Sequence, residues 1–172
     1  MTYPDTSPPI DTLPYRPCAG VMLLNRDGRV FVGQRLDSVL EAWQMPQGGI
    51  DPGEAPLDAA IRELGEEAGI APHLVELVAE APEELEYDLP ADLVGKVWKG
   101  KWRGQRQRWF LFAFLGDDGD VNIATAEPEF RAWRWVEPAE LPHIIVPFKR
   151  DLYARLLELF AEPIAARGRP AG

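Results

Sequence analysis

The sequence is poor in cysteine and histidine, and it contains no long apolar run. Cys18 is the only cysteine, which excludes an internal disulfide, and its apolar neighbours favour a buried structural thiol over a nucleophile. The two histidines, His73 and His143, stand apart from any cluster and are interpreted as surface or packing residues. The first residues show no basic region followed by an apolar stretch, and nowhere do about 18 apolar residues follow one another. We therefore expect neither secretion nor membrane insertion, and a reducing cytoplasm fits.

The composition predicts one acidic domain. At 172 residues and 46% hydrophobic content the chain can build one core, and its net charge is −10. We expect this domain to span residues 15–160. Residues 1–14 are rich in Pro, Thr, Ser and Asp and are expected to form a flexible lead, whereas residues 161–172 are expected to fray. A monomer is assumed, because the sequence does not determine the oligomeric state.

Apolar periodicity predicts an α/β fold. Strands at 18–24 and 30–34 flank a turn at 25–28 (Asn-Arg-Asp-Gly), whose chemistry favours a hairpin. Further strands are predicted at 75–81, 109–115 and 131–136, and helices at 56–68 and 148–160. Strands separated by two helices indicate a mixed β-sheet with helices on both faces.

The segment 56–68 has the features of an amphipathic helix with one acidic face. Pro56 suits the first turn, and Gly69 fits the position just after the last turn. An apolar stripe recurs at helical spacing and consists of Leu57, Ala60, Ile61, Leu64 and Ala68. Three carboxylates share the opposite face, because residues three and four apart are neighbours on a helix: Glu63, Glu66 and Glu67.

The acidic face predicts a site for hard divalent cations. Like charges at this spacing disfavour an isolated helix by about 0.2–0.5 kcal/mol per pair, so a counter-charge would stabilise it. Magnesium takes oxygen ligands and is usually bound by one or two carboxylates plus substrate phosphates, which suits a phosphorylated substrate. Three glutamates alone would favour a solvated acidic helix face over a cation site.

The full spacing around this helix resembles the signature box of the Nudix hydrolases. Its nine defined positions are all present: Gly48, Glu54, Arg62, Glu63, Leu64, Glu66, Glu67, Gly69 and Ile70. The resemblance implies an α/β/α sandwich and hydrolysis of nucleoside diphosphates linked to another group. It also implies Mg²⁺ or Mn²⁺ bound through the box glutamates, and an Arg62 that orients Glu54 by ion pairing. The backbone carbonyl of Gly48 is a further candidate ligand.

Stretches outside the box resemble the bacterial RNA pyrophosphohydrolases and the related dinucleoside polyphosphate hydrolases. They are Tyr15-Arg16-Pro17, the segment 43–49 (Trp-Gln-Met-Pro-Gln-Gly-Gly), Pro128-Glu129-Phe130, Trp133-Arg134-Trp135 and Phe148-Lys149-Arg150. By this resemblance Glu129 is an additional metal ligand and a candidate general base. Arg16 and Arg35 hold phosphate or the first base, and Phe148 and Lys149 flank the 5′ end. Without the resemblance, Glu129 would be interpreted as an exposed loop carboxylate, and Phe148 as a core residue that anchors the last helix.

A basic segment stands out in this acidic chain. Residues 96–108, here called the basic arm, hold six of the 18 Lys and Arg and no acid, so 12 basic residues remain against 28 acidic ones elsewhere. Trp98 and Trp102 are interleaved with these charges. The arm can attract phosphates through its charges and stack on bases through its aromatic rings. We therefore expect the substrate phosphates to contact Lys99, Lys101 and Arg103. Alternatively, it is a basic hairpin edge that prevents aggregation.

These features predict a metal-dependent hydrolase of 5′-polyphosphorylated nucleotides. Release of pyrophosphate from 5′-triphosphorylated RNA, a step of mRNA decay, is the favoured reaction. The alternative is asymmetric cleavage of diadenosine tetraphosphate, with Tyr87 stacking on adenine as the resemblance to that branch implies. A Nudix module that senses a nucleotide without cleaving it is a third hypothesis, disfavoured by the intact glutamates. A domain that interacts through the basic arm alone would leave the acidic helix unexplained.

Overall fold

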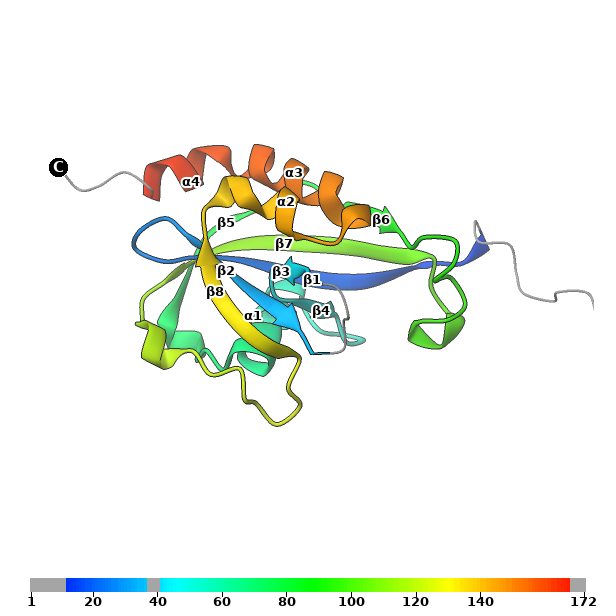
Figure 1. Cartoon of the computed structure of the whole chain (residues 1–172), viewed down its shortest axis with the longest axis horizontal. Coiled ribbons are helices and arrows are strands. Elements are labelled where there is room, and N and C mark those ends of the chain that lie inside the picture. Colours follow the sequence, from blue (N-terminus) through cyan, green and yellow to red (C-terminus); the bar gives the residue numbers. More distant parts are fainter. Residues whose placement is uncertain (1–11, 37–40, 168–172) are drawn as a thin grey trace, which may run out of the picture.

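The computed structural model describes residues 12–36 and 41–167. Most of the expected N-terminal lead and the last five residues of the expected tail lie outside the described residues. Figure 1 shows three layers, with a central sheet between one helix below and several helices above. The predicted α/β sandwich with a mixed sheet is therefore confirmed.

Two long parallel strands form the centre of the sheet. β1 (Tyr15–Leu24) pairs in parallel with β7 (Gly104–Phe114), in a register from Tyr15 opposite Gly104 to Leu24 opposite Ala113. The sheet has the order β3-β2-β1-β7-β5, with β4 beside β1, β6 beside β7 and β8 beside β2. All pairs other than β1 and β7 are antiparallel. The remaining strands are β2 (Val30–Arg35), β3 (Trp43–Gln44), β4 (Gln47–Gly49), β5 (Val75–Glu80), β6 (Leu85–Asp88) and β8 (Phe130–Val136).

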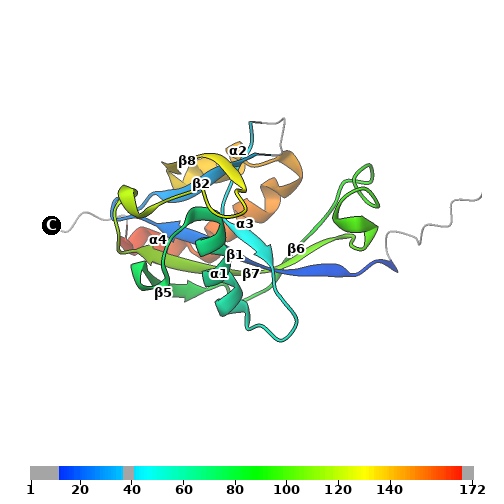
Figure 2. The ribbon, with the colours of Figure 1, turned by 90° about the horizontal axis from the view of Figure 1, so that it is seen from below.

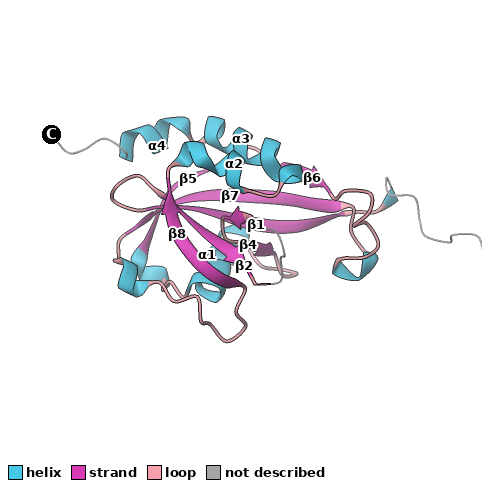
Figure 3. Ribbon diagram, viewed as in Figure 1, coloured by secondary structure: helices cyan, strands magenta, loops and turns pink. Residues whose placement is uncertain are grey.

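Helices cover both faces of the sheet and create two cores (Figures 1 and 3). On one face, α1 (Pro56–Ala68) packs Ala60 and Leu64 against Val21 and Phe112. The other face is covered by α2 (Leu141–Ile144), α3 (Arg150–Leu159) and α4 (Ala161–Arg167), with Leu156 of α3 in the second core. Short 3-10 turns lie at Pro72–Leu74, Trp98–Gly100, Asp118–Asp120, Pro138–Glu140 and Pro147–Lys149.

The predicted strands and helices are present, and the structure adds three short strands and a C-terminal helix. β1 and β2 form the expected hairpin, with Leu24 opposite Val30. The strands β3, β4 and β6 were not predicted, because segments of two to four residues carry too little periodicity. Part of the tail that we expected to fray forms α4, where Ile164 packs against the core of the α3 face. Within the described residues, no helix has the length and apolar character needed to cross a bilayer.

The basic arm lies at one end of the molecule. The chain between β6 and β7 projects away from the body at the end where β1 begins, as two perpendicular views show (Figures 1 and 2). The loop that leads from β4 into α1 lies on the same side of the sheet as α1 (Figure 2). The fold thus places the box helix, the loop before it and the arm next to the start of β1.

Candidate active site

The backbone around α1 fixes the position of its acidic face. Pro56 occupies the first turn, and Gly69 ends the helix with φ 66° while its N–H donates to the Gly65 carbonyl. A Cβ at Gly69 would collide with the backbone carbonyl of Asn122, so both conformation and space require glycine. The apolar stripe of α1 is buried under the sheet, which turns Glu63 and Glu67 toward β4.

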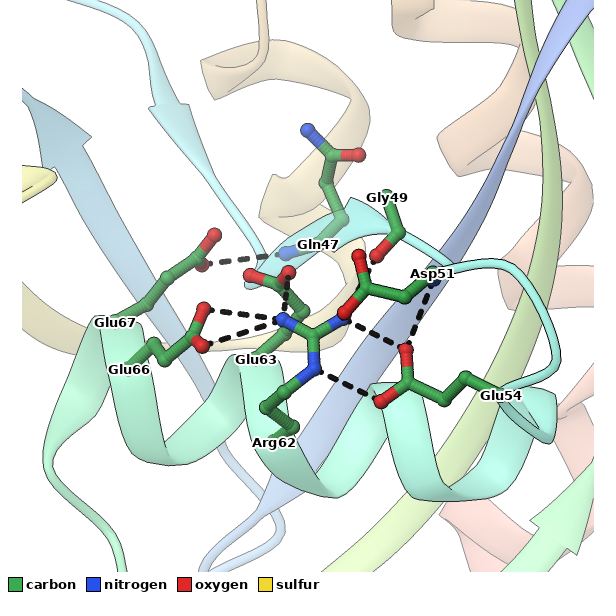
Figure 4. Close-up of polar contacts among 8 residues, drawn as sticks. All are labelled: Gln47, Gly49, Asp51, Glu54, Arg62, Glu63, Glu66 and Glu67. Atoms are coloured by element: carbon green, nitrogen blue, oxygen red, sulfur yellow. Dashed lines mark hydrogen bonds and ion pairs between the residues drawn. The ribbon is translucent and has the colours of Figure 1, made fainter.

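Arg62 joins the box loop to the helix (Figure 4). Its Nε and Nη2 donate to the two carboxylate oxygens of Glu54, at 2.9 and 2.8 Å, and Nη2 also donates to the Gly49 carbonyl at 2.9 Å. The hydrogen bonds from Arg62 and from the Asp51 backbone N–H lower the pKa of Glu54 to about 2. This bidentate pair has the geometry that the resemblance implies, and it ties the loop carrying Glu54 to α1.

The same guanidinium also holds two of the candidate metal ligands. Its Nη1 donates to Glu63 at 2.9 Å and to Glu66 at 3.2 Å. Glu63 is nearly buried, with 11% of its side chain exposed, and this burial raises its pKa despite the nearby Arg62. Glu66 lies at the surface with 57% of its side chain exposed, so it can turn freely.

Glu67 is the most deeply buried carboxylate of the site. It is 4% exposed and accepts one hydrogen bond, from the Gln47 backbone N–H at 3.2 Å (Figure 4). Burial, and then the charges of Glu63 and Glu129, raise its pKa well above the usual range. The charge of Arg35 lowers this pKa only in part, so a bound cation would supply further compensation for the buried carboxylate.

The oxygens gathered here fit Mg²⁺ or Mn²⁺. The donors are hard carboxylate oxygens, and a Cβ at Gly48 would overlap the Glu63 carboxylate, so glycine is what allows this close approach. Among the described residues, no three acidic, histidine or cysteine side chains already converge on one cation position. Glu63 and Glu66 instead both accept hydrogen bonds from Arg62.

Glu129 reaches the box from the loop before β8. It lines a pocket of about 540 Å³ whose other walls are Arg62, Glu63, Gly65, Glu66, Glu67, Thr125, Ala126 and Glu127. Arg35 lies 3.9 Å from the Glu129 carboxylate. The hydroxyl of Thr125 is buried in this pocket without a hydrogen-bond partner in the described structure. Sequence reasoning missed Thr125, because no local pattern marks a loop threonine that tertiary contacts bury.

The predicted contacts to the 5′ end lie on the α3 side of the sheet. The Lys149 Nζ is 5.0 Å from the centroid of the Tyr87 ring and 5.9 Å from that of Phe148. Burial, and then the charge of Arg35, lower the pKa of Lys149 to about 8. Tyr87 differs from the expectation of a stacking platform: it is only 7% exposed and packs against Phe148 at 5.8 Å. The strict alternation of β6 turns Tyr87 into the core.

The arginines of the basic arm are paired within the protein. Arg103 binds Asp88 at 3.0 Å, and Arg106 binds Glu86 at 2.7 Å, while Arg108 pairs with Glu80. Arg103 therefore already has an anionic partner, unlike the exposed Lys99 and Lys101, for which no ion pair is seen among the described residues. The alternating acids of residues 80–88 were the signal for this cross-strand pairing.

The chain is similar to known proteins in sequence and in fold. Residues 14–156 match the NUDIX domain family. An RNA pyrophosphohydrolase of Sphingopyxis alaskensis is 65% identical over 150 residues, which cover 87% of this chain and 95% of that protein. Another, from Roseobacter denitrificans, is 60% identical over 151 residues, covering 88% and 94%. An Ap4A hydrolase of C. elegans, solved as a binary complex, has a TM-score of 0.65 at 25% identity and covers 88% of this chain and 98% of its own.

Proposed function

The chain belongs to the NUDIX family, and from this membership we propose that it removes pyrophosphate from the 5′ end of triphosphorylated RNA and leaves a 5′-monophosphate. The observation that carries the hydrolase chemistry is the intact box, in which Arg62 ties Glu54 to α1 and Glu67 is buried near the charges of two other glutamates. The names of the two bacterial relatives, which match nearly their full length, support RNA as the substrate.

In this proposal the glutamates of α1 hold the cation. Glu63, Glu66 and Glu67, with the Gly48 carbonyl and Glu129, would bind Mg²⁺ or Mn²⁺. When bound, the cation supplies neutralisation of phosphate oxygens and a lower pKa for water. Water then attacks phosphorus, the anhydride bond breaks, and pyrophosphate leaves. The proton of that water goes to a glutamate of the site, with Glu129 and the box glutamates as candidates.

Basic side chains around the site hold the rest of the substrate. We assign phosphate or 5′-end contacts to Arg16, Arg35 and Lys149, because the charges of both arginines act on Tyr87 and that of Arg35 also acts on Lys149, which places the three cations near one another. Because the lowered pKa of Lys149 is about 8, its positive charge and its attraction for phosphate are lost as pH rises through this value. An enzyme that acts on transcripts in this way would work in the cytoplasm.

The second candidate is hydrolysis of a dinucleoside polyphosphate. The likeness to the C. elegans Ap4A hydrolase favours it, since that fold covers 88% of the chain at 25% identity. Both reactions use the same box, and they differ in what extends from the phosphates. The buried ring of Tyr87 weakens the version in which this tyrosine stacks on adenine.

A direct comparison of the two substrates tests the proposal. Purified protein with Mg²⁺ is incubated with 5′-triphosphorylated RNA and, at equal concentration, with diadenosine tetraphosphate. We expect a higher kcat/KM on the RNA, with pyrophosphate as product, and a larger loss on RNA than on the dinucleotide for Lys149→Ala. A higher kcat/KM on the dinucleotide would contradict RNA as the main substrate and would support the second candidate. Absence of hydrolysis of either, with both substrates still bound, would favour a nucleotide sensor.

A further inference from the structure

A second pocket lies on the other side of the box, toward the basic arm. It has a volume of about 550 Å³ and shares Arg62 and Glu63 with the pocket that holds Glu129. Its other walls are Arg16 and Pro17 of β1, Gly49 of β4, the loop Ile50, Asp51, Pro52, Gly53 and Glu54, and Trp102 of the arm. Substrate phosphates bound at the box glutamates would thus have open space on two sides.

The two pockets differ in charge. Five glutamates line the first, whereas the three acids of the second all contact Arg62: Asp51 at 3.6 Å, Glu54 at 2.8 Å and Glu63 at 2.9 Å. Arg16 has no carboxylate partner among the described residues. The three acids of the second pocket are thus all engaged by Arg62, and Arg16 is left without a carboxylate within the described part of the chain, so its guanidinium can bind an anionic group of a ligand.

Trp102 lies at the edge of this pocket, next to a residue that is anchored to the start of β1. The next residue, Arg103, donates its backbone N–H to the Pro14 carbonyl at 3.0 Å, and its guanidinium lies 4.7 Å from the Tyr15 ring centroid. Asp88 accepts hydrogen bonds from Arg103 at 3.0 Å and from the Tyr15 hydroxyl at 2.7 Å. The cluster of Tyr15, Asp88 and Arg103 thus anchors the arm to β1 and leaves Trp102 partly exposed.

The backbone of the arm is strained directly before Trp102. Trp98 and Lys99 have φ of 52° and 59°, a region that bulky side chains rarely enter. Such a conformation persists only where its surroundings enforce it, and it is frequent at ligand sites. Trp98 packs partly against the core, and the Arg16 guanidinium lies 5.8 Å from its ring centroid. Arg16 is thereby held between the arm and the box.

We propose that this second pocket is a nucleotide subsite through which RNA leaves the box along the basic arm. One base stacks on Trp102, Arg16 binds the adjoining phosphate, and Lys99 with Lys101 meet the phosphates that follow. The subsite rests on the proposed function. RNA fits better than a dinucleoside polyphosphate, because RNA supplies a phosphate for every nucleotide, whereas the dinucleotide has none beyond its second nucleoside. With a dinucleoside polyphosphate bound, Lys99 and Lys101 would have no substrate phosphate to contact.

Substrates of different length test the subsite. For Trp102→Ala, we expect KM on a 5′-triphosphorylated tetranucleotide to rise about tenfold, since a base stacked on an aromatic ring contributes substantially to affinity. KM on a nucleoside triphosphate, which does not reach the subsite, should stay within twofold. Trp102→Phe keeps a stacking face and should restore most of the loss. An equal loss on both substrates, or no loss on the tetranucleotide, overturns the subsite.

Binding without turnover separates the subsite from the proposed function. In Glu67→Gln protein, we expect Trp102→Ala to weaken tetranucleotide binding, and Lys99→Ser with Lys101→Ser to flatten its salt dependence. Arg26→Ser, on the distant β1–β2 turn, is the matched control and should change neither. If the parent enzyme fails to hydrolyse RNA while this Trp102-dependent binding persists, the proposed function falls and the subsite stands. If substitution of Trp102 and of both lysines leaves tetranucleotide binding unchanged, the subsite is contradicted even if RNA is hydrolysed.

Discussion

At the scale of single residues, we expect the burial of the Glu67 carboxylate to lower the stability of the cation-free protein. Its carboxylate is 4% exposed, and its nearest charged neighbours include two other glutamates. A neutral side chain of the same shape would fit the cation-free protein better, because no buried charge would need compensation. The cation site that we propose would explain why a carboxylate is present at this position.

Glu67→Gln tests whether this carboxylate lowers stability and is needed for activity. We expect hydrolysis to fall at least about 10- to 100-fold at saturating Mg²⁺, since an anionic ligand is lost. In the absence of divalent cations, the Tm of this variant should equal or exceed that of the parent. Exposed Glu162 provides the control, and Glu162→Gln should retain full activity. Activity of Glu67→Gln within twofold of the parent contradicts its role as a ligand.

Cys18 is the opposite case of a reactive group made inert by its surroundings. It is fully buried, and burial raises the pKa of its thiol to about 12. The folded protein should react with a thiol reagent at pH 8 only as fast as it unfolds, whereas protein in denaturant should react at once. Because folding raises the pKa of Cys18, the contribution of this thiol to the free energy of unfolding is fully present below the usual thiol pKa. It is lost as pH rises toward 12. Rapid labelling of folded protein would contradict the buried position.

At the scale of elements, two glycines of the α1 segment have opposite roles. Gly69 ends the helix at φ 66° beside the Asn122 carbonyl, while Gly65 lies inside the helix, where a Cβ would meet only the Ile70 carbonyl at 3.7 Å. The first is required by geometry. The second costs helix stability and gives open space next to the acidic face.

Replacing each glycine by alanine separates these roles in one measurement of unfolding. Gly69→Ala should lower the free energy of unfolding by about 1–3 kcal/mol, because it combines a left-handed backbone with a steric clash. Gly65→Ala should raise it by about 0.5–1 kcal/mol. Denaturant titrations of both variants give the two signs directly, and equal signs would refute the assigned geometry.

At the scale of the whole molecule, charge is divided between regions. The chain has a net charge of −10, and Glu63, Glu66 and Glu67 concentrate part of the negative charge at one site on the box helix. The arm offsets this only at its tip, because Arg103, Arg106 and Arg108 are paired with acids of β5 and β6. A cation bound at α1 relieves the repulsion, so metal binding and stability should be linked.

Metal removal measures this linkage. With Mg²⁺ at about 100 times its dissociation constant, binding contributes about 2.7 kcal/mol, which corresponds to a rise of roughly 5–10 °C in Tm. EDTA should remove this rise and abolish hydrolysis. In Glu67→Gln the rise should be smaller at the same Mg²⁺ concentration. Identical Tm values in Mg²⁺ and EDTA would show that the acidic face binds no cation.

The sequence by itself determined what depends on neighbours along the chain. Helix periodicity and the terminal glycine specify α1, and the resemblance to the box implied the pairing of Arg62 with the loop residue Glu54. Only the tertiary structure decided the long-range contacts. The parallel pairing of β1 with β7 brings Arg16 near Trp102, and packing buries Tyr87 and brings Glu129 to the box. These residues are far apart in sequence, and no local pattern encodes the sheet order that joins them.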